Sequence, residues 1–277
     1  MPKWGAADLD LKVVCDRYLG ATDELDHLQE LLLKVAPSWC RRLRAWGSTK
    51  DQLPIDVAQP GALRDAVLEI ATRRGPTYQA LVERHGPGDE RLFGSAELRG
   101  AGPELTVVVS VDERVVSSLG KTIRLGNTIA LQVRRPRMEG QAAADWAEMA
   151  FESVCDQFSP VWGGGGHPAE YWAKVMTEQP PIRALGWDFG RFLPAVFWLN
   201  FFGRPYRQLI GEDRLRSTPA SQVLPADQGV LIGLGLEPSS WDTADYAAAE
   251  QKVRDHLGAD LFFSKAEPDR PTIAPHW

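Results

Sequence analysis

The apolar positions of this chain change period along its length, and the change separates helical from extended segments. Leu25, Leu28, Leu32 and Val35 recur at three- and four-residue spacing, which is typical of one face of a helix that begins at an N-cap, Thr22. Because the same spacing returns elsewhere, further helices are predicted from Gly61, over 142–158 and from an Asp242 cap to Gly258.

Apolar residues alternate with a period of two in other segments, which is typical of strands with one buried face. Leu105, Val107 and Val109 share such a face. The dipeptide Gly126-Asn127 between two apolar runs predicts a hairpin of 121–125 with 128–133. Further strands are predicted over 95–99, 222–224 and 230–234, with a short strand over 11–15 in an N-terminal stretch, 1–21, that is otherwise expected to be weakly structured.

The most aromatic stretch of the chain runs from Leu185 to Gly211. It is continuously apolar over 195–202 except for Asn200, which predicts a strand buried on both faces and ended by Gly203. Pro205 then suits the first turn of a short helix. Upstream, four glycines at 163–166 predict a sharp bend or a bulge, because glycine tolerates backbone angles that other residues avoid.

These elements together predict an α+β fold in which helices pack on an antiparallel or mixed sheet. Tight turns join several of the strands, which disfavours βαβ units. We find no solenoid repeat and no low-complexity linker, so one domain spanning 1–277 is expected, with 1–75 as a mainly helical N-terminal layer.

Composition and charge narrow the classes of function. The formal net charge of −6 disfavours a surface that grips nucleic-acid phosphates; it is compatible with a basic protein partner, and equally with solubility alone. The N-terminus lacks a long apolar segment and no run is long enough to span a membrane, so a cytoplasmic protein is expected. Cys15, Cys40 and Cys155 are far apart, which suits free thiols better than disulfides or a zinc site.

Two sequence patterns that imitate nucleotide-binding motifs fail on inspection. Gly120-Lys121-Thr122 resembles the end of a P-loop, but Val115 stands where the motif requires its first glycine. Gly233 and Gly235 resemble the start of a dinucleotide fingerprint, but Pro238 stands at its third glycine. No cofactor is therefore predicted, and the histidine spacing predicts no metal site.

The side chains next to the glycine run offer one alternative. His167 lies beside Gly166 and precedes Glu170, and Asp188 follows in the aromatic stretch. An enzyme with a cleft near the glycines could use His167 with Glu170 or Asp188 for acid–base catalysis. The opposing interpretation is structural: a lone loop histidine is usually solvated, and Asp188 can pair with Arg191 three residues later.

Three segments together resemble the immunity protein 52 family of bacterial polymorphic-toxin systems. They are FSPVWGGGGHPAEYW, FLPAVFWLNFFGRPYRQLIG and GVLIGLGLEPSSWDTADYAAAEQKVRDHLG, and the likeness covers roughly residues 90–265. It lies in a layout of a tryptophan-containing strand after the central helix, an aromatic strand, a small strand pair and a closing helix. The resemblance implies a cytoplasmic α+β protein, not an enzyme, that neutralises a cognate toxin, often a nuclease.

On that reading the partner is a toxin protein, bound by exposed acidic loops. The candidates are Asp112 and Glu113, at the meander turn before the strand predicted over 121–125, and Glu170 after the glycine loop. They are chosen because loops place charge within reach of a partner. Besides the enzyme, a structural protein without a toxin partner remains a third hypothesis.

Overall fold

The computed structural model describes most of the predicted helices and strands. The segments described are 5, 8–17, 19, 22–35, 42–46, 53–66, 95–100, 105–110, 115–116, 122–123, 127–134, 141–176, 189, 191–268 and 270–275.

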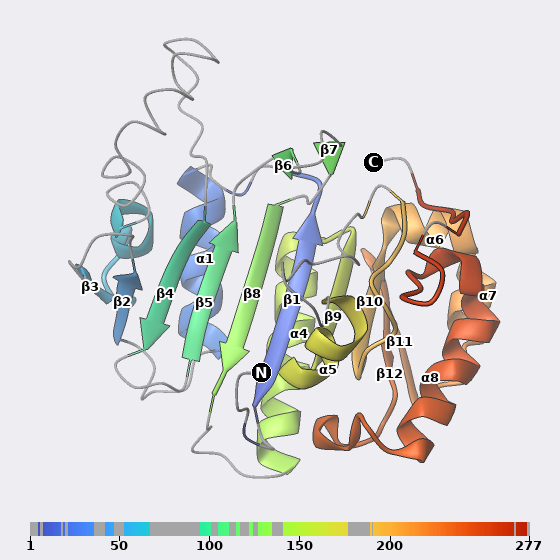
Figure 1. Cartoon of the computed structure of the whole chain (residues 1–277). Coiled ribbons are helices and arrows are strands. Elements are labelled where there is room, and N and C mark those ends of the chain that lie inside the picture. Colours follow the sequence, from blue (N-terminus) through green and yellow to red (C-terminus); the bar gives the residue numbers. More distant parts are fainter. Residues whose placement is uncertain are drawn as a thin grey trace.

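A ten-stranded sheet forms the centre of the molecule, in the order β11-β12-β10-β9-β1-β8-β5-β4-β2-β3 (Figure 1). Every neighbouring pair in it is antiparallel. Together with the helices packed on it, the sheet confirms the predicted α+β class. The strands are β1 (Leu9–Cys15), β2 (Arg42–Trp46), β3 (Leu53–Asp56), β4 (Ser95–Gly100), β5 (Leu105–Ser110), β8 (Asn127–Val133), β9 (Trp162–Gly166), β10 (Leu199–Gly203), β11 (Gln222–Ala226) and β12 (Gly229–Gly233).

The strand nearest the N-terminus lies in the middle of the sheet. β1 pairs with β8 on one side and with β9 on the other. Leu9, Leu11 and Val13 are buried on one of its faces. The short strand predicted over 11–15 is therefore confirmed, and it begins two residues earlier, at Leu9. The expectation of weak structure is wrong for residues 9–10, because hydrogen bonds to two neighbouring strands hold them in place.

The hairpin predicted around Gly126-Asn127 does not form as a pair of neighbouring strands. The strand before it, β7 (Thr122–Ile123), pairs with β6 (Val115–Val116) in a separate two-stranded sheet. β8, the strand after it, pairs instead with β1 and β5. A seven-residue strand with two long partners gains more ladder bonds than a short hairpin would supply, so the longer pairing prevails.

Helices cover both faces of the sheet. Figure 1 shows α1 and α4 behind it and α5 in front of it. Within 1–75, α1 contributes to this helical covering, while β1, β2 and β3 join the sheet itself. The helices are α1 (Thr22–Val35), α4 (Gln141–Phe158), α5 (Pro168–Val175), α6 (Arg204–Ile210), α7 (Glu212–Arg216) and α8 (Ala244–Leu257), with short 3₁₀ turns at Pro238–Ser240 and Ala259–Leu261.

The helices predicted from Thr22, over 142–158 and up to Gly258 agree with the structure except at one cap. The helix predicted from Gly61 is helical over 62–66, and its remainder lies outside the described residues. The apolar stripe of α1 is buried as expected, and the indole Nε1 of Trp146 on α4 donates to the carbonyl of Val35 at 2.7 Å, which holds the two helices together. α8 is capped by Thr243, whose side chain accepts from the amide of Tyr246, and not by Asp242. Gly258 ends α8 with a φ of +111°, as glycine permits.

The aromatic stretch is the core of the C-terminal half, but less of it is strand than predicted. β10 begins at Leu199, and the segment before it is extended and buried, with Leu193 bridged to Phe262. Trp198 is 2% exposed. The predicted short helix is confirmed as α6, with Pro205 in its first turn. None of the described helices is long and apolar enough to cross a membrane.

Candidate functional site

The four glycines form a strand in the interior of the sheet, so the predicted bend or bulge is wrong. They make up most of β9, which pairs with β1 and β10. Neighbouring side chains occupy the space where their own Cβ atoms would lie: a Cβ on Gly164 would be 2.7 Å from Trp162 and 2.9 Å from Phe197. The missing side chains let α5 lie close to the sheet, where the hydroxyl of Tyr171 donates to the carbonyl of Gly164.

His167 follows this strand and caps α5. Its Nδ1 accepts from the amide of Ala169 at 3.2 Å, which leaves the ring proton on Nε2 to be donated to the carbonyl of Gly5 at 3.0 Å. The ring also stacks on Trp241, with centroids 6.4 Å apart and planes 9° from parallel. Both ring nitrogens are thus engaged, and the side chain is buried. The geometry is that of a structural cap.

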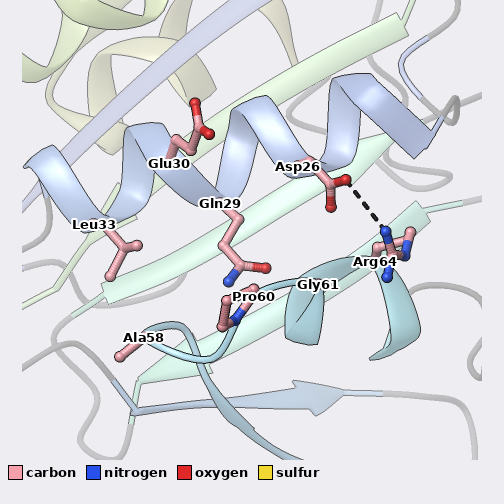
Figure 2. Close-up of a pocket in the computed structure, with 8 residues that line it drawn as sticks. All are labelled: Asp26, Gln29, Glu30, Leu33, Ala58, Pro60, Gly61 and Arg64. Atoms are coloured by element: carbon pink, nitrogen blue, oxygen red, sulfur yellow. Dashed lines mark hydrogen bonds and ion pairs between the residues drawn. The ribbon is translucent and has the colours of Figure 1, made fainter.

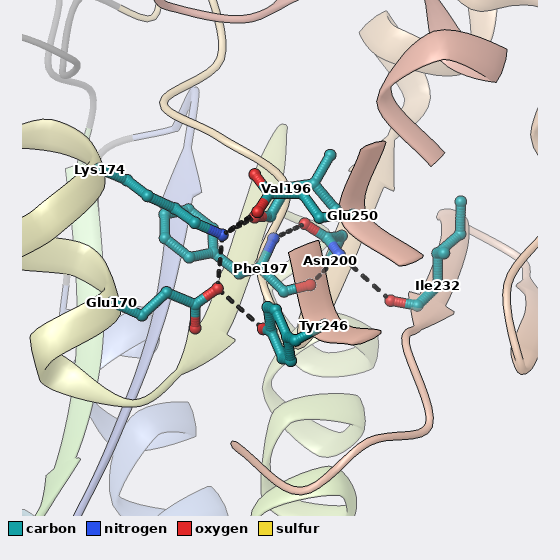
Figure 3. A network of polar contacts seen from close by, with 8 residues as sticks. All are labelled: Glu170, Lys174, Val196, Phe197, Asn200, Ile232, Tyr246 and Glu250. Carbon is teal, nitrogen blue, oxygen red and sulfur yellow. Dashed lines mark hydrogen bonds and ion pairs between the residues drawn. The ribbon is translucent and has the colours of Figure 1, made fainter. Parts of the chain in front are cut away.

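Glu170 lies in the first turn of α5 and is fully buried, at 0% exposure. Its Oε1 accepts from the hydroxyl of Tyr246 at 2.8 Å and from Nζ of Lys174 at 2.7 Å (Figure 3). Oε2 is also buried and accepts no hydrogen bond among the described residues. Burial raises the pKa of the Glu170 carboxyl to about 7, although Lys174 and Tyr246 oppose the rise.

Lys174 joins three separate parts of the chain. Besides Glu170 it contacts Oε2 of Glu250 on α8 at 2.9 Å and donates to the carbonyl of Val196 at 2.7 Å. Its ammonium lies 5.3 Å from the centre of the Phe197 ring. We call Glu170, Lys174, Tyr246 and Glu250 the Glu170 cluster; it fastens α5 and α8 to the segment that leads into β10.

Asn200, the polar residue inside the apolar run, forms hydrogen bonds to nearby backbone groups. Its Oδ1 accepts from the amide of Phe197 at 2.9 Å, and its Nδ2 donates to the carbonyl of Phe197 at 2.7 Å. Nδ2 also reaches the carbonyl of Ile232 on β12 at 3.5 Å (Figure 3). The side chain therefore satisfies buried backbone groups where the chain turns into β10.

A carboxyl group with a pKa near neutrality beside a lysine and a tyrosine is a combination found in acid–base catalysis. Catalysis also requires that a substrate reach those groups. Glu170 and Tyr246 are 0% exposed, and the side chain of Lys174 is 16% exposed. The contacts of the Glu170 cluster are made within the protein, as expected for a buried network that holds packed elements together.

The residues predicted as sites have different outcomes. Asp112, Glu113 and Asp188 lie outside the described residues, so their roles stay predictions. Glu170 was expected in an exposed loop, and that placement is wrong: it belongs to a helix and its carboxylate faces the interior. The reason is tertiary, because Tyr246 and Lys174 give the buried carboxylate hydrogen-bond partners.

A groove of about 450 Å³ runs between α1 and the segment 58–64 (Figure 2). Gln29 of α1 fastens the two walls: its Nε2 donates to the carbonyl of Val57 at 2.9 Å, and its Oε1 accepts from the amide of Leu63 at 3.0 Å. An ion pair of 3.2 Å crosses between Asp26 and Arg64. The lining residues are Asp26, Gln29, Glu30, Leu33, Ala58, Pro60, Gly61 and Arg64.

An acidic row on α4 is a surface that sequence reasoning did not single out. Asp145, Glu148, Glu152 and Asp156 follow one another at three- and four-residue spacing, and Met149 lies among them at 45% exposure. Partial burial raises the pKa of Glu148, and the neighbouring carboxylates of Asp145 and Glu152 raise it further. The spacing was visible in the sequence, because α4 contains four acids and no base.

No group of three or more His, Cys, Asp or Glu side chains within the described segments is arranged to hold a metal ion. Cys15 and Cys155 are buried free thiols, and burial raises the pKa of both. Cys40 lies outside the described residues.

The comparisons with known proteins concern the fold. No protein-family model matches the chain, and no curated protein matches it either. Among solved structures, the Pseudomonas aeruginosa T6SS protein PA0821 is similar, with a TM-score of 0.53 and 14% sequence identity over 90% of this chain and 75% of that one. At this identity the likeness shows a shared fold. The resemblance to the immunity protein 52 family therefore stays a prediction.

Proposed function

We propose that this protein is a cytoplasmic immunity protein that binds a cognate bacterial toxin and neutralises it by forming a stoichiometric complex. The observation that carries the proposal is the fold shared with PA0821, which is described as a T6SS protein of Pseudomonas aeruginosa. The resemblance of three segments of this chain to a family of toxin antagonists suggests a role in a bacterial toxin system. A nuclease is the first toxin class to test, because that family often opposes nucleases.

The contacts of His167 and Glu170, the two residues considered for acid–base catalysis, support a binding protein over an enzyme. Both ring nitrogens of His167 are used in capping α5 and in contacting Gly5. Oε1 of Glu170 accepts hydrogen bonds from Tyr246 and Lys174. An enzyme built on His167 and Glu170 would need both side chains to leave these contacts.

The test is to co-express the full chain with the product of each neighbouring toxin-like gene and to follow cell growth. Purified toxin, assayed for its own activity, is then titrated with the purified protein. Stoichiometric inhibition predicts that activity falls linearly and ends at one equivalent of protein, with a complex of matching mass in light scattering.

The two alternative functions, an enzyme and a structural protein, predict different results when the toxin is titrated with this protein. An enzyme that inactivates the toxin or its product would protect far below one equivalent, and protection would grow with time. A structural protein would neither rescue growth nor form a complex. Failure of the wild type to bind any neighbouring product would refute the immunity proposal.

A further inference from the structure

The negative charge of this protein is concentrated on two helices. α1 carries four acids and one lysine, and α4 carries four acids and no base, which gives the pair a formal charge of −7. The whole chain has a formal charge of −6. The other 245 residues are therefore close to neutral, and the charge is located on one part of the structure.

The two helices lie on the same side of the sheet. Figure 1 shows both behind it, and the bond from Trp146 to Val35 joins them. Arg17 links their other ends: it pairs with Glu24 of α1 at 3.2 Å and donates to the carbonyl of Gln157 on α4 at 3.2 Å. The two helices therefore lie side by side on this side of the sheet.

Several acids of these two helices make no ion pair with any of the described residues. Glu24 pairs with Arg17, and Asp26 pairs with Arg64. Among the described residues no ion pair engages Asp23 or Glu30 of α1, or Glu148, Glu152 and Asp156 of α4.

The row of like charges on α4 lowers the stability of the free protein. Like charges four residues apart on a helix destabilise it by about 0.2–0.5 kcal/mol per pair. Glu148, Glu152 and Asp156 make two such pairs in succession. Burial raises the pKa of Glu148, and the neighbouring carboxylates of Asp145 and Glu152 raise it further. A row of acids that destabilises its own helix is what a surface that meets a basic partner would show.

Apolar side chains accompany the charges. Met149 is 45% exposed among the acids of α4, and Leu33 is 36% exposed at the groove beside α1 (Figure 2). In the same groove, Oδ1 of Asp26 accepts no hydrogen bond among the described residues. Protein interfaces combine exposed apolar anchors, among which methionine is enriched, with a charged rim that guides association.

We propose that this acidic helix face, formed by Glu30 and Leu33 of α1 with Glu148, Met149, Glu152 and Asp156 of α4, is the surface that docks a lysine- and arginine-rich face of the toxin. The inference rests on the proposed function and adds the location and the chemistry of its interface. Charge complementarity selects the occupant: a second copy of this chain would bring acid against acid, and nucleic acid or anionic lipid would be repelled.

The experiment uses the full chain and a catalytically inactivated form of the neighbouring toxin. Association is measured by stopped flow at several salt concentrations for the wild type and for Glu148→Lys/Glu152→Lys. The double variant is expected to associate at least about tenfold more slowly at low salt and to show a weaker salt dependence, because steering by charge acts mainly on the association rate.

A matched control carries the same change in net charge elsewhere. Glu237→Lys/Glu267→Lys replaces two exposed acids outside the acidic helix face and is expected to change the rate by less than about twofold. Glu148→Gln/Glu152→Gln serves if the lysine variant does not fold, and should show an intermediate rate. Melting temperatures establish that each variant is folded.

The outcomes separate the two proposals. If the wild type binds the toxin and Glu148→Lys/Glu152→Lys binds equally fast, the toxin docks elsewhere and this inference is overturned while the immunity function stands. Equal slowing by both lysine variants would show an effect of net charge alone and would also overturn it. If the wild type binds no toxin, the proposed function fails and the inference fails with it.

Discussion

The hydroxyl of Tyr246 donates a 2.8 Å hydrogen bond to the carboxylate of Glu170, which lies 76 residues earlier in the chain. Both side chains are 0% exposed. The bond joins α8 to α5 and so attaches the closing helix of the chain to the helix that covers the glycine strand. It is a hydrogen bond to an ionisable group in the interior, where losing a partner is costly.

Tyr246→Phe is expected to lower the free energy of unfolding by about 1.5–3 kcal/mol, because it removes a hydrogen bond to the buried carboxylate and fills the same space with a phenyl ring. Urea denaturation measures the loss. Tyr206→Phe is the matched control: Tyr206 is also fully buried, but its hydroxyl has no partner among the described residues. An equal loss in both variants would show that the bond to Glu170 contributes nothing of its own.

The stability of the protein should fall as pH rises through the range in which Glu170 titrates. The unfolded carboxyl has a pKa of 4.5 and the folded one of about 7. Between these values the unfolded state loses its proton first, so deprotonation favours unfolding, and the effect is complete above about pH 7. The loss from this group is on the order of 2–4 kcal/mol.

Glu170→Gln isolates that contribution, because the variant cannot titrate at this position. The free energy of unfolding is measured in urea from pH 4.5 to 8 for both proteins, and the difference between the two curves is the quantity of interest. The wild type is expected to lose stability relative to the variant as pH rises from about 4.5 to 7. A constant difference would mean that Glu170 does not titrate in this window.

Gly164→Ala tests the close packing of the glycine strand. The added methyl would lie within 3 Å of the rings of Trp162 and Phe197, and overpacking of a core typically costs about 1–3 kcal/mol. Calorimetry should show a lower melting temperature with the fold retained. An unchanged melting temperature would indicate that the two rings move aside freely.

Trp198→Ala should cost about 3–5 kcal/mol, since the side chain is 2% exposed and its removal leaves a cavity in the core of the C-terminal half. The expected result is an insoluble or strongly destabilised protein, followed by thermal melting where it can be purified. A soluble variant that melts with the wild type would place Trp198 outside the core.

Glu152→Gln is expected to stabilise the free protein by about 0.4–1 kcal/mol, because it removes two like-charge pairs, with Glu148 and Asp156, four residues away on either side. Chemical denaturation at low salt measures the gain, which should shrink as salt is added. Glu237→Gln, at an exposed acid outside the helices, is the control and should leave stability unchanged. A loss of stability in Glu152→Gln would show that this glutamate makes a favourable contact.

Local patterns predicted the helices well. The apolar stripes of α1 and α4 follow from residue spacing. The start of α6 follows from Gly203 and Pro205. Such signals are local, because the apolar face of a helix is formed by residues three and four apart. The N-cap of α8 was misplaced by one residue, since Asp242 and Thr243 are both good caps and the side-chain geometry selects Thr243.

The candidate site was only partly predictable. His167 and Glu170 were singled out from their positions beside the glycines, but their roles were not, because their partners Gly5 and Tyr246 lie far away in the sequence. The interface roles of Asp112 and Glu113 stay predictions. The spacing of the acids in α4 could be seen in the sequence. Whether these acids are exposed depends on which side of the helix faces the sheet, and the sequence does not show that.

The sequence by itself determined the α+β class and the buried aromatic centre, because hydrophobic period and apolar content act over short distances. The tertiary structure alone decided that the N-terminal strand lies in the middle of the sheet and that four glycines form its neighbour β9. A run of glycines has no side chains, so it shows no alternation of apolar and polar residues from which a strand could be predicted. Its conformation is set by the strands on either side and by the rings of Trp162, Phe151 and Phe197 that occupy the empty Cβ positions, and these contacts exist only once the chain is folded.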